Sequence, residues 1–165
     1  MCSSDLIAPA HFHKETGEFM MSRGGHTSRA AMFRHSNFRT TTVQENVDNL
    51  LYIMNAVRQI SPDITCLLTV SPVPMNATNE FKSAIMADCV SKSTLRVAIN
   101  EVMNKNLSRV LYWPSFEMVR WFGGHAGRVF GNDDGSSHHP DIALINTIMD
   151  SFIDTFGDDA LKALR

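Results

Sequence analysis

The sequence predicts an α/β fold whose strands run parallel. Two short apolar segments, residues 64–70 and 109–113, are each stopped at once by a proline, as expected for strands buried on both faces of a parallel sheet. Helical patterns precede, separate and follow them. The order helix, strand, helices, strand, loop, helix favours parallel strands joined by helices. A doubly wound sheet usually has roughly four or five strands, so the two strands that we recognise predict an incomplete sheet.

The first helix is predicted to begin at Thr42, which has capping-box spacing to Glu45. It should end at Ser61-Pro62, because the residue before a proline disfavours helical backbone angles. Its apolar residues recur at helical spacing, at Val43, Val47, Leu50, Leu51, Met54 and Val57.

A second helical region is predicted from Thr78 to about Asn104, with a break near residues 91–93. The last helix should have Pro140 at its first position and end at Gly157. Residues 1–41 are weakly patterned, and we expect mostly loop there, with one short strand near residues 18–21.

The composition fits one soluble globular domain and excludes several functional classes. The chain has 165 residues, which is long enough for one hydrophobic core. Of these residues 44% are hydrophobic and 19% are charged, as is ordinary for a globular domain, and the net charge is −2. It has neither the basic stripe of a nucleic-acid-binding protein nor the apolar run of about 20 residues of a membrane span. The N-terminus lacks a signal-peptide pattern, so we expect a cytoplasmic protein.

The cysteines and histidines predict no metal site. Cys2, Cys66 and Cys89 fit neither a disulfide framework nor paired metal spacing, and the apolar surroundings of Cys66 and Cys89 predict core thiols. His11 and His13 could share one face of a strand, but no third ligand is in register. We therefore expect no cofactor.

Three polar segments follow the predicted strands or face their ends: residues 71–78, 114–117 and 131–140. Ligands of α/β sheets bind beyond the carboxyl ends of the strands, so we expect these segments to converge. The candidate substrate contacts are Ser71, Lys92, Ser115 and Glu117. Lys92 could meet an anionic substrate or simply stay solvated, and Ser115 and Glu117 could line the cleft or begin the next turn.

The stretch DDGSSHHPD, residues 133–141, is the densest group of candidate catalytic side chains. His139 would lie just before the last helix, where the helix dipole favours a neutral imidazole that can act as a general base. Asp133 or Asp134 could orient the ring, as a carboxylate does in a catalytic triad. Alternatively, His139 only caps the helix and the two aspartates form a turn with Gly135.

Several of these segments together resemble the GSCFA family. TVSPVPMNAT, SKSTLR, YWPSFEMV and FGNDDGSSHHPD occur in this order, and the helix in NFRTTTVQENVDNL precedes them. The resemblance covers about residues 35–156. The family belongs with the SGNH/GDSL-like hydrolases, bacterial proteins of flavodoxin-like, three-layer α/β fold. It therefore implies esterase chemistry on an acylated substrate, with polysaccharide-linked acyl groups as one candidate.

By position, His139 matches the histidine near the last helix of these enzymes. The acid expected three residues earlier is Ser136 here, so the resemblance leaves Asp134, or else Asp133, as its partner. The Gly-Ser-Cys-Phe-Ala segment that carries the family's nucleophile is not recognisable, because neither a strand nor a glycine frames Cys2 and Ser3.

The resemblance thus implies a partial GSCFA-like domain at residues 35–165 behind a weakly structured segment at 1–34. Two alternatives to a hydrolase remain. One is a non-catalytic carbohydrate-binding or interaction module built from the SPVP, SK and 131–139 segments. The other is an incomplete fold, a truncated or reduced paralogue, that needs a partner chain or a second copy to complete its sheet.

Overall fold

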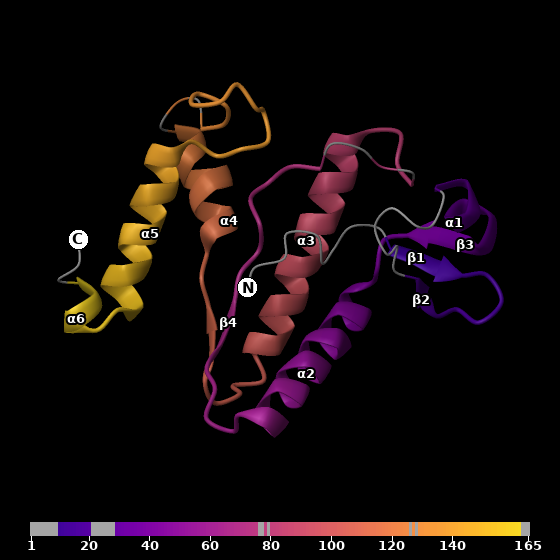
Figure 1. Cartoon of the computed structure of the whole chain (residues 1–165), viewed down its shortest axis with the longest axis horizontal. Coiled ribbons are helices and arrows are strands. Elements are labelled where there is room, and N and C mark those ends of the chain that lie inside the picture. The colour runs from indigo at the N-terminus through magenta and orange to yellow at the C-terminus, as the bar shows by residue number, and fades with distance from the viewer. Residues whose placement is uncertain are drawn as a thin grey trace. The chain divides into compact units, whose positions relative to one another are not determined.

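The computed structural model describes residues 10–20, 29–75, 78, 80–125, 127 and 129–162. The chain divides into two compact units. One, the α2–α3 unit, draws its described residues from 5–64 and 75–108. The other, the β4–β5 unit, draws them from 65–74 and 109–165. Figure 1 shows the helices and strands of both units.

The α2–α3 unit begins with a small antiparallel sheet of order β2-β1-β3. Its strands are β1 (Ala10–His13), β2 (Phe19–Met20) and β3 (Ser36–Arg39), and helix α1 (Arg29–His35) precedes β3. The strand predicted near residues 18–21 is β2, whereas the prediction of loop for the rest of this segment missed β1, α1 and β3. Strand β1 pairs with the nearby β2 and with β3, which is distant in the sequence, and strand propensity in such short segments depends strongly on these neighbours.

Helix α2 (Val43–Ile60) begins as predicted. The Thr42 hydroxyl accepts a hydrogen bond from the Glu45 backbone N–H, and the Glu45 carboxylate accepts one from the Thr42 N–H. Arg39 donates two further bonds to the same carboxylate, at 2.6 and 2.9 Å. The capping box therefore also joins β3 to the first turn of α2.

Helix α3 (Ala84–Met103) is continuous, so the predicted break at residues 91–93 and the start at Thr78 were wrong. Ser91 and Lys92 are buried on the helix face that carries Leu95, together with Asp88. The Asp88 carboxylate accepts the backbone N–H of Met75 at 3.0 Å. The polar residues that suggested a loop instead occupy a buried polar stretch of α3, which packs on α2.

The β4–β5 unit confirms the α/β prediction with parallel strands. Strand β4 (Cys66–Leu68) pairs with β5 (Val110–Tyr112) in the register Cys66↔Val110, Leu67↔Leu111, Leu68↔Tyr112. In the described part of the chain this sheet has two strands.

Burial in the two strands differs from the prediction. Leu67 and Leu111, which face each other across the pair, are 40% and 38% exposed, so these strands are not buried on both faces. Of the two cysteines expected in the core, Cys66 is half-buried and Cys89 is exposed. Cys2 and Ser3 lie outside the described residues.

Strand β5 leads into one run of helical turns: α4 (Ser115–Glu117), a π-helix η1 (Met118–Phe122) and a 3₁₀ turn η2 (Gly123–His125). Helices α5 (Ile142–Phe156) and α6 (Asp159–Lys162) end the described chain. Trp113, just after β5, packs edge-on against Phe152 and Phe156 of α5, with ring centroids 5.3 and 5.7 Å apart. These aromatic contacts hold α5 against the end of β5.

None of the helices in the described ranges combines the length and hydrophobicity that a membrane crossing requires.

Candidate functional site

The segment from Val129 to Asp141 forms a loop that is closed at its neck. Phe130 and Pro140 form an antiparallel bridge, and two backbone bonds of 3.0 Å flank it, from Gly131 N–H to His139 C=O and from Asp141 N–H to Val129 C=O. Gly131 has a φ of 72°, a conformation that other residues rarely adopt. The bridge and these two bonds therefore fix the backbone position of His139.

Within this loop His139 is paired with Asp134. Nδ1 of His139 lies 2.5 Å from Oδ2 of Asp134, and because an ionised carboxylate only accepts, Nδ1 is the donor. The Ser136 backbone N–H donates to the other carboxylate oxygen at 2.8 Å. The hydrogen bond from His139, followed by that from Ser136, lowers the pKa of Asp134. The Asp134 carboxylate is therefore held by both the His139 ring and the Ser136 backbone.

The two aspartates that the sequence could not separate have different partners. Asp134 bonds His139, whereas Asp133 accepts the backbone N–H of Ile142, the first residue of α5, at 2.5 Å. Asp133 therefore satisfies one of the donors that every helix leaves unpaired at its start. The sequence analysis treated a turn at residues 133–135 and a pair of His139 with an aspartate as alternatives. The structure contains both.

The predicted position of His139 at the helix end is wrong. Helix α5 begins at Ile142, with Asp141 in the capping position, and Pro140 is held in its bridge to Phe130 rather than in the first turn. His139 thus lies before the turn where the dipole acts most strongly. The predicted dipole effect on the ring does not apply, and Asp134 is the charge next to it.

A buried carboxylate that the sequence analysis missed supports the loop from inside. Asp141 is buried and accepts bonds from the backbone N–H of Asn132, at 2.8 Å, and from the Asn132 side-chain amide. A buried charge of this kind requires such partners. In the sequence, Asp141 follows a proline and precedes an apolar helix. This pattern is too common to identify a buried carboxylate.

The two candidate serines lie where the strands end. Ser71 is buried, and its Oγ accepts the Val73 backbone N–H at 3.3 Å. Ser115 Oγ donates to the Val70 carbonyl at 3.0 Å and lies 2.6 Å from the Thr69 hydroxyl, which must then be the donor to it. None of these bonds involves a histidine. They join the start of α4 to the segment after β4.

The other two candidates, Glu117 and Lys92, belong to different units of the chain. Glu117 lies in α4, where both of its carboxylate oxygens accept the Tyr112 hydroxyl, at 2.9 and 2.7 Å. Lys92 belongs to the α2–α3 unit and is buried within α3, so the expectation that it stays solvated was wrong. Contact of Lys92 with an anionic substrate stays a prediction.

Arg120 joins the predicted segments to one another, and the sequence analysis did not select it. Its Nε donates to the carbonyl of Pro72, in the SPVP segment, at 2.8 Å. Its guanidinium lies 5.6 Å from the ring centroid of Phe130, at the neck of the histidine loop, within the range of a cation–π contact. One side chain thus connects the end of β4 to the loop that carries His139. The only sequence signal was one charge within the apolar run MVRWF.

A serine–histidine pair in the α2–α3 unit does not have the geometry of a catalytic pair. His11 Nδ1 lies 2.6 Å from Ser36 Oγ, but Ser36 donates its proton to the Met32 carbonyl. His11 must therefore donate to Ser36 and cannot remove its proton. Burial lowers the pKa of His11.

His13 accepts two backbone N–H groups on Nδ1. Among the described residues, no group of three or more His, Cys, Asp or Glu side chains could hold a metal ion.

A family model described as the GSCFA family matches residues 8–152. This chain belongs to the GSCFA family. The match confirms the resemblance carried by residues 35–156 and extends it back across β1, β2 and α1. No curated protein and no solved structure matched the chain.

Proposed function

We propose that this GSCFA chain is a hydrolase of SGNH type, with a flavodoxin-like arrangement, that acts on an acyl ester. His139 is the general base and Asp134 is its positioning residue. The proposal rests chiefly on the 2.5 Å bond between Asp134 Oδ2 and His139 Nδ1. That bond favours the tautomer with a proton on Nδ1, so the Nε2 lone pair can take a proton from the attacking nucleophile.

Neither Ser71 nor Ser115 is proposed as the nucleophile, and the Gly-Ser-Cys-Phe-Ala segment expected to carry it is not recognisable in this sequence. The Ser115 proton is donated to the Val70 carbonyl, and Ser71 lies in a backbone turn. A hydroxyl nucleophile needs a base within hydrogen-bond reach. Ser71, Ser115 and Glu117 are instead proposed to line the substrate region at the strand ends. The proposed substrate carries a small acyl ester, with a polysaccharide-linked ester as the candidate class.

The test is hydrolysis of p-nitrophenyl acetate and related short acyl esters by the purified chain. His139→Ala should lower turnover by about 10²- to 10⁴-fold, the usual contribution of a general base, and Asp134→Asn should lower it in the same direction. His138→Ala is the matched control, since His138 is the adjacent imidazole and its Nδ1 lies near Ser137 Oγ instead. Turnover that survives His139→Ala would contradict the proposal.

One observation favours a non-catalytic role as the second candidate. The His139 and Asp134 side chains are 68% and 48% exposed, whereas catalytic electrostatics are strongest where water is excluded. A wild-type chain that hydrolyses none of the esters would support the interaction-module alternative.

A further inference from the structure

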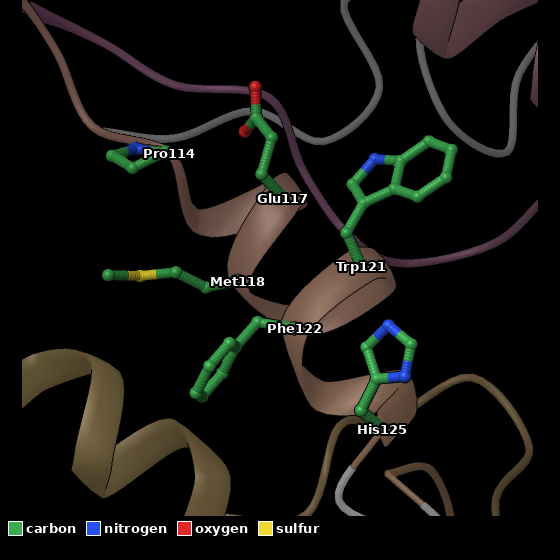
Figure 2. Close-up of a pocket in the computed structure, with 6 residues that line it drawn as sticks. All are labelled: Pro114, Glu117, Met118, Trp121, Phe122 and His125. Carbon is green, nitrogen blue, oxygen red and sulfur yellow. The ribbon is translucent and has the colours of Figure 1, made fainter.

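The helical run after β5 has an unusual pattern of exposure. Trp121 and Phe122 are 68% and 77% exposed, and Figure 2 shows the Trp121 side chain projecting from the run, where it lines an open groove. Arg120, the charged residue beside them, is instead half-buried. A surface helix normally shows the reverse, with its charged residues in water and its large apolar residues inside. The inward position of Arg120 therefore depends on the groups that it contacts.

Arg120 contacts two segments that are far apart in the sequence. Its Nε donates to the carbonyl of Pro72, in the segment that follows β4, at 2.8 Å. Its guanidinium carbon lies 5.6 Å from the centre of the Phe130 ring. Proline has no backbone N–H, so the carbonyl is the only backbone group through which Pro72 can be held. A planar guanidinium can donate from its edge and stack on a ring with its face, which a lysine ammonium cannot do.

Phe130 connects this contact to the backbone of His139. Phe130 pairs with Pro140 in the antiparallel bridge, and the Gly131 N–H next to it donates to the His139 carbonyl at 3.0 Å. Asp134 and His139, which bond each other, both lie within the loop that this bridge closes. A shift of Phe130 would therefore move the pair as one body and leave the hydrogen bond inside it intact.

We propose that Arg120 is a positioning residue that fixes the His139 loop against the segment after the carboxyl end of β4. Ligands of parallel sheets bind at such ends, and the hydrogen bonds of Ser71 and Ser115, which are proposed to line the substrate region, lie there. The effect on rate rests on the proposed hydrolysis. A base displaced by about 1 Å can lose about 10²-fold in rate, although it keeps its own partner.

Ester hydrolysis by Arg120→Ala tests the positioning role. We expect kcat to fall about 10- to 100-fold with little change in KM, because the base is displaced while the substrate contacts stay. Guanidinium ion, added well below the concentration that unfolds the chain, should restore part of kcat by occupying the vacated position. Arg120→Lys should have a kcat between those of wild type and Arg120→Ala, since it keeps a donor but loses the planar face.

Two control variants show whether the effect is specific to Arg120. Arg58→Ala also removes an arginine bonded to a backbone carbonyl, that of Ser108 at 2.5 Å, but in the α2–α3 unit. Trp121→Ala removes the exposed neighbour of Arg120 on the same run. Both variants should keep the kcat of wild type and should not respond to guanidinium ion. A kcat that His139→Ala lowers and Arg120→Ala does not would overturn the inference and leave the proposed hydrolysis standing.

Amide hydrogen exchange, followed by NMR, tests the hold on the loop without any turnover. The Gly131 and Asp141 amides close the neck of the loop, and they should exchange about tenfold faster in Arg120→Ala and slow again when guanidinium ion is added. Phe130→Leu, which keeps an apolar side chain without the aromatic face, should act in the same direction in a chain that still melts cooperatively. Faster exchange in a chain whose wild type hydrolyses no ester would contradict the proposed hydrolysis and support the hold by Arg120. Unchanged exchange at both amides would overturn the inference.

Discussion

At the scale of single residues, three aspartates of the histidine loop have different hydrogen-bond partners. Asp134 bonds the imidazole of His139, Asp133 caps the first turn of α5, and Asp141 holds Asn132 from the buried side. The same residue type serves three roles because each carboxylate meets a different donor. Sequence spacing alone could name the candidates and could not assign the roles.

Gly157 follows the last turn of α5 and packs closely against the backbone of Ile153. A Cβ at this position would lie 2.5 Å from the Ile153 carbonyl oxygen, closer than real Cβ contacts. Gly157→Ala should therefore lower the free energy of unfolding by about 1–3 kcal/mol, measured by urea denaturation.

Gly124→Ala is the matched control for that substitution. A Cβ at Gly124 would meet nothing within 4 Å, and the residue lies in the 3₁₀ turn η2. Its replacement should be neutral or stabilise by up to about 1 kcal/mol. Equal destabilisation by the two substitutions would show that the contact with Ile153 is not the cause.

At the scale of elements, the start of α2 joins local and tertiary structure. The hydrogen bonds from Arg39, and then the backbone bond from Thr42, lower the pKa of Glu45 to about 2 from its ordinary value of 4.5. A carboxylate with a depressed folded pKa stabilises the folded state above its unfolded pKa. That stability is lost as the pH falls through the window from about 4.5 to about 2.

Glu45→Gln should lower the free energy of unfolding by about 1 kcal/mol at neutral pH, a modest value because both side chains are about 40% exposed and solvent screens the pair. The difference from wild type should shrink as the pH is lowered from 4.5 to 2. Glu101→Gln, an exposed glutamate of α3, is the control and should show little effect. A difference that stays constant over this pH range would contradict the assignment.

Comparison of the predicted and observed elements shows which sequence signals were sufficient to predict a helix or a strand. Helix α2 was predicted because its capping box and its apolar spacing agree, and the parallel pair was predicted from two proline-stopped apolar segments. Helix α3 was broken in the prediction because Ser91, Lys92 and Ser93 look like a loop, whereas tertiary packing buries the first two. Strand β1 was missed because it is only four residues long and one of its two neighbours in the sheet, β3, is distant in the sequence.

The site was predictable to a similar extent. Family resemblance and spacing selected His139 and Asp134 as candidates, and the structure places them in hydrogen-bond contact. The start of α5 was misplaced because Pro140 is held in a bridge to Phe130. Arg120 and Asp141 could not be selected from the sequence. Arg120 contacts Pro72 and Phe130, and Asp141 contacts Asn132, only in the folded chain.

At the scale of the whole molecule, several apolar faces are left uncovered within the individual units. Among the described residues β4 and β5 pair only with each other, and the Leu67–Leu111 face of that pair is exposed. Helix α5 has no fully buried residue, although Ile142, Ile145 and Met149 form an apolar stripe along it. Open strand edges and large apolar patches favour association.

We therefore predict that the purified chain self-associates through these uncovered faces. Light scattering coupled to size-exclusion chromatography should give a mass above 18.4 kDa that rises with protein concentration. Ile145→Lys together with Met149→Lys should shift the chain toward the monomer, whereas Ile60→Lys, at the exposed end of α2 in the other unit, serves as control. A cooperative monomer at all concentrations would contradict the prediction.

The most direct test of the central claim is the tautomer of His139, read from ¹⁵N–¹H correlation spectra of its imidazole near neutral pH. Asp134 should hold the proton on Nδ1 and leave Nε2 unprotonated, and Asp134→Asn should change this pattern at His139 while His138 is unaffected. A ring of His139 that carries its proton on Nε2, or that does not respond to Asp134→Asn, would contradict the assignment of His139 as an oriented general base.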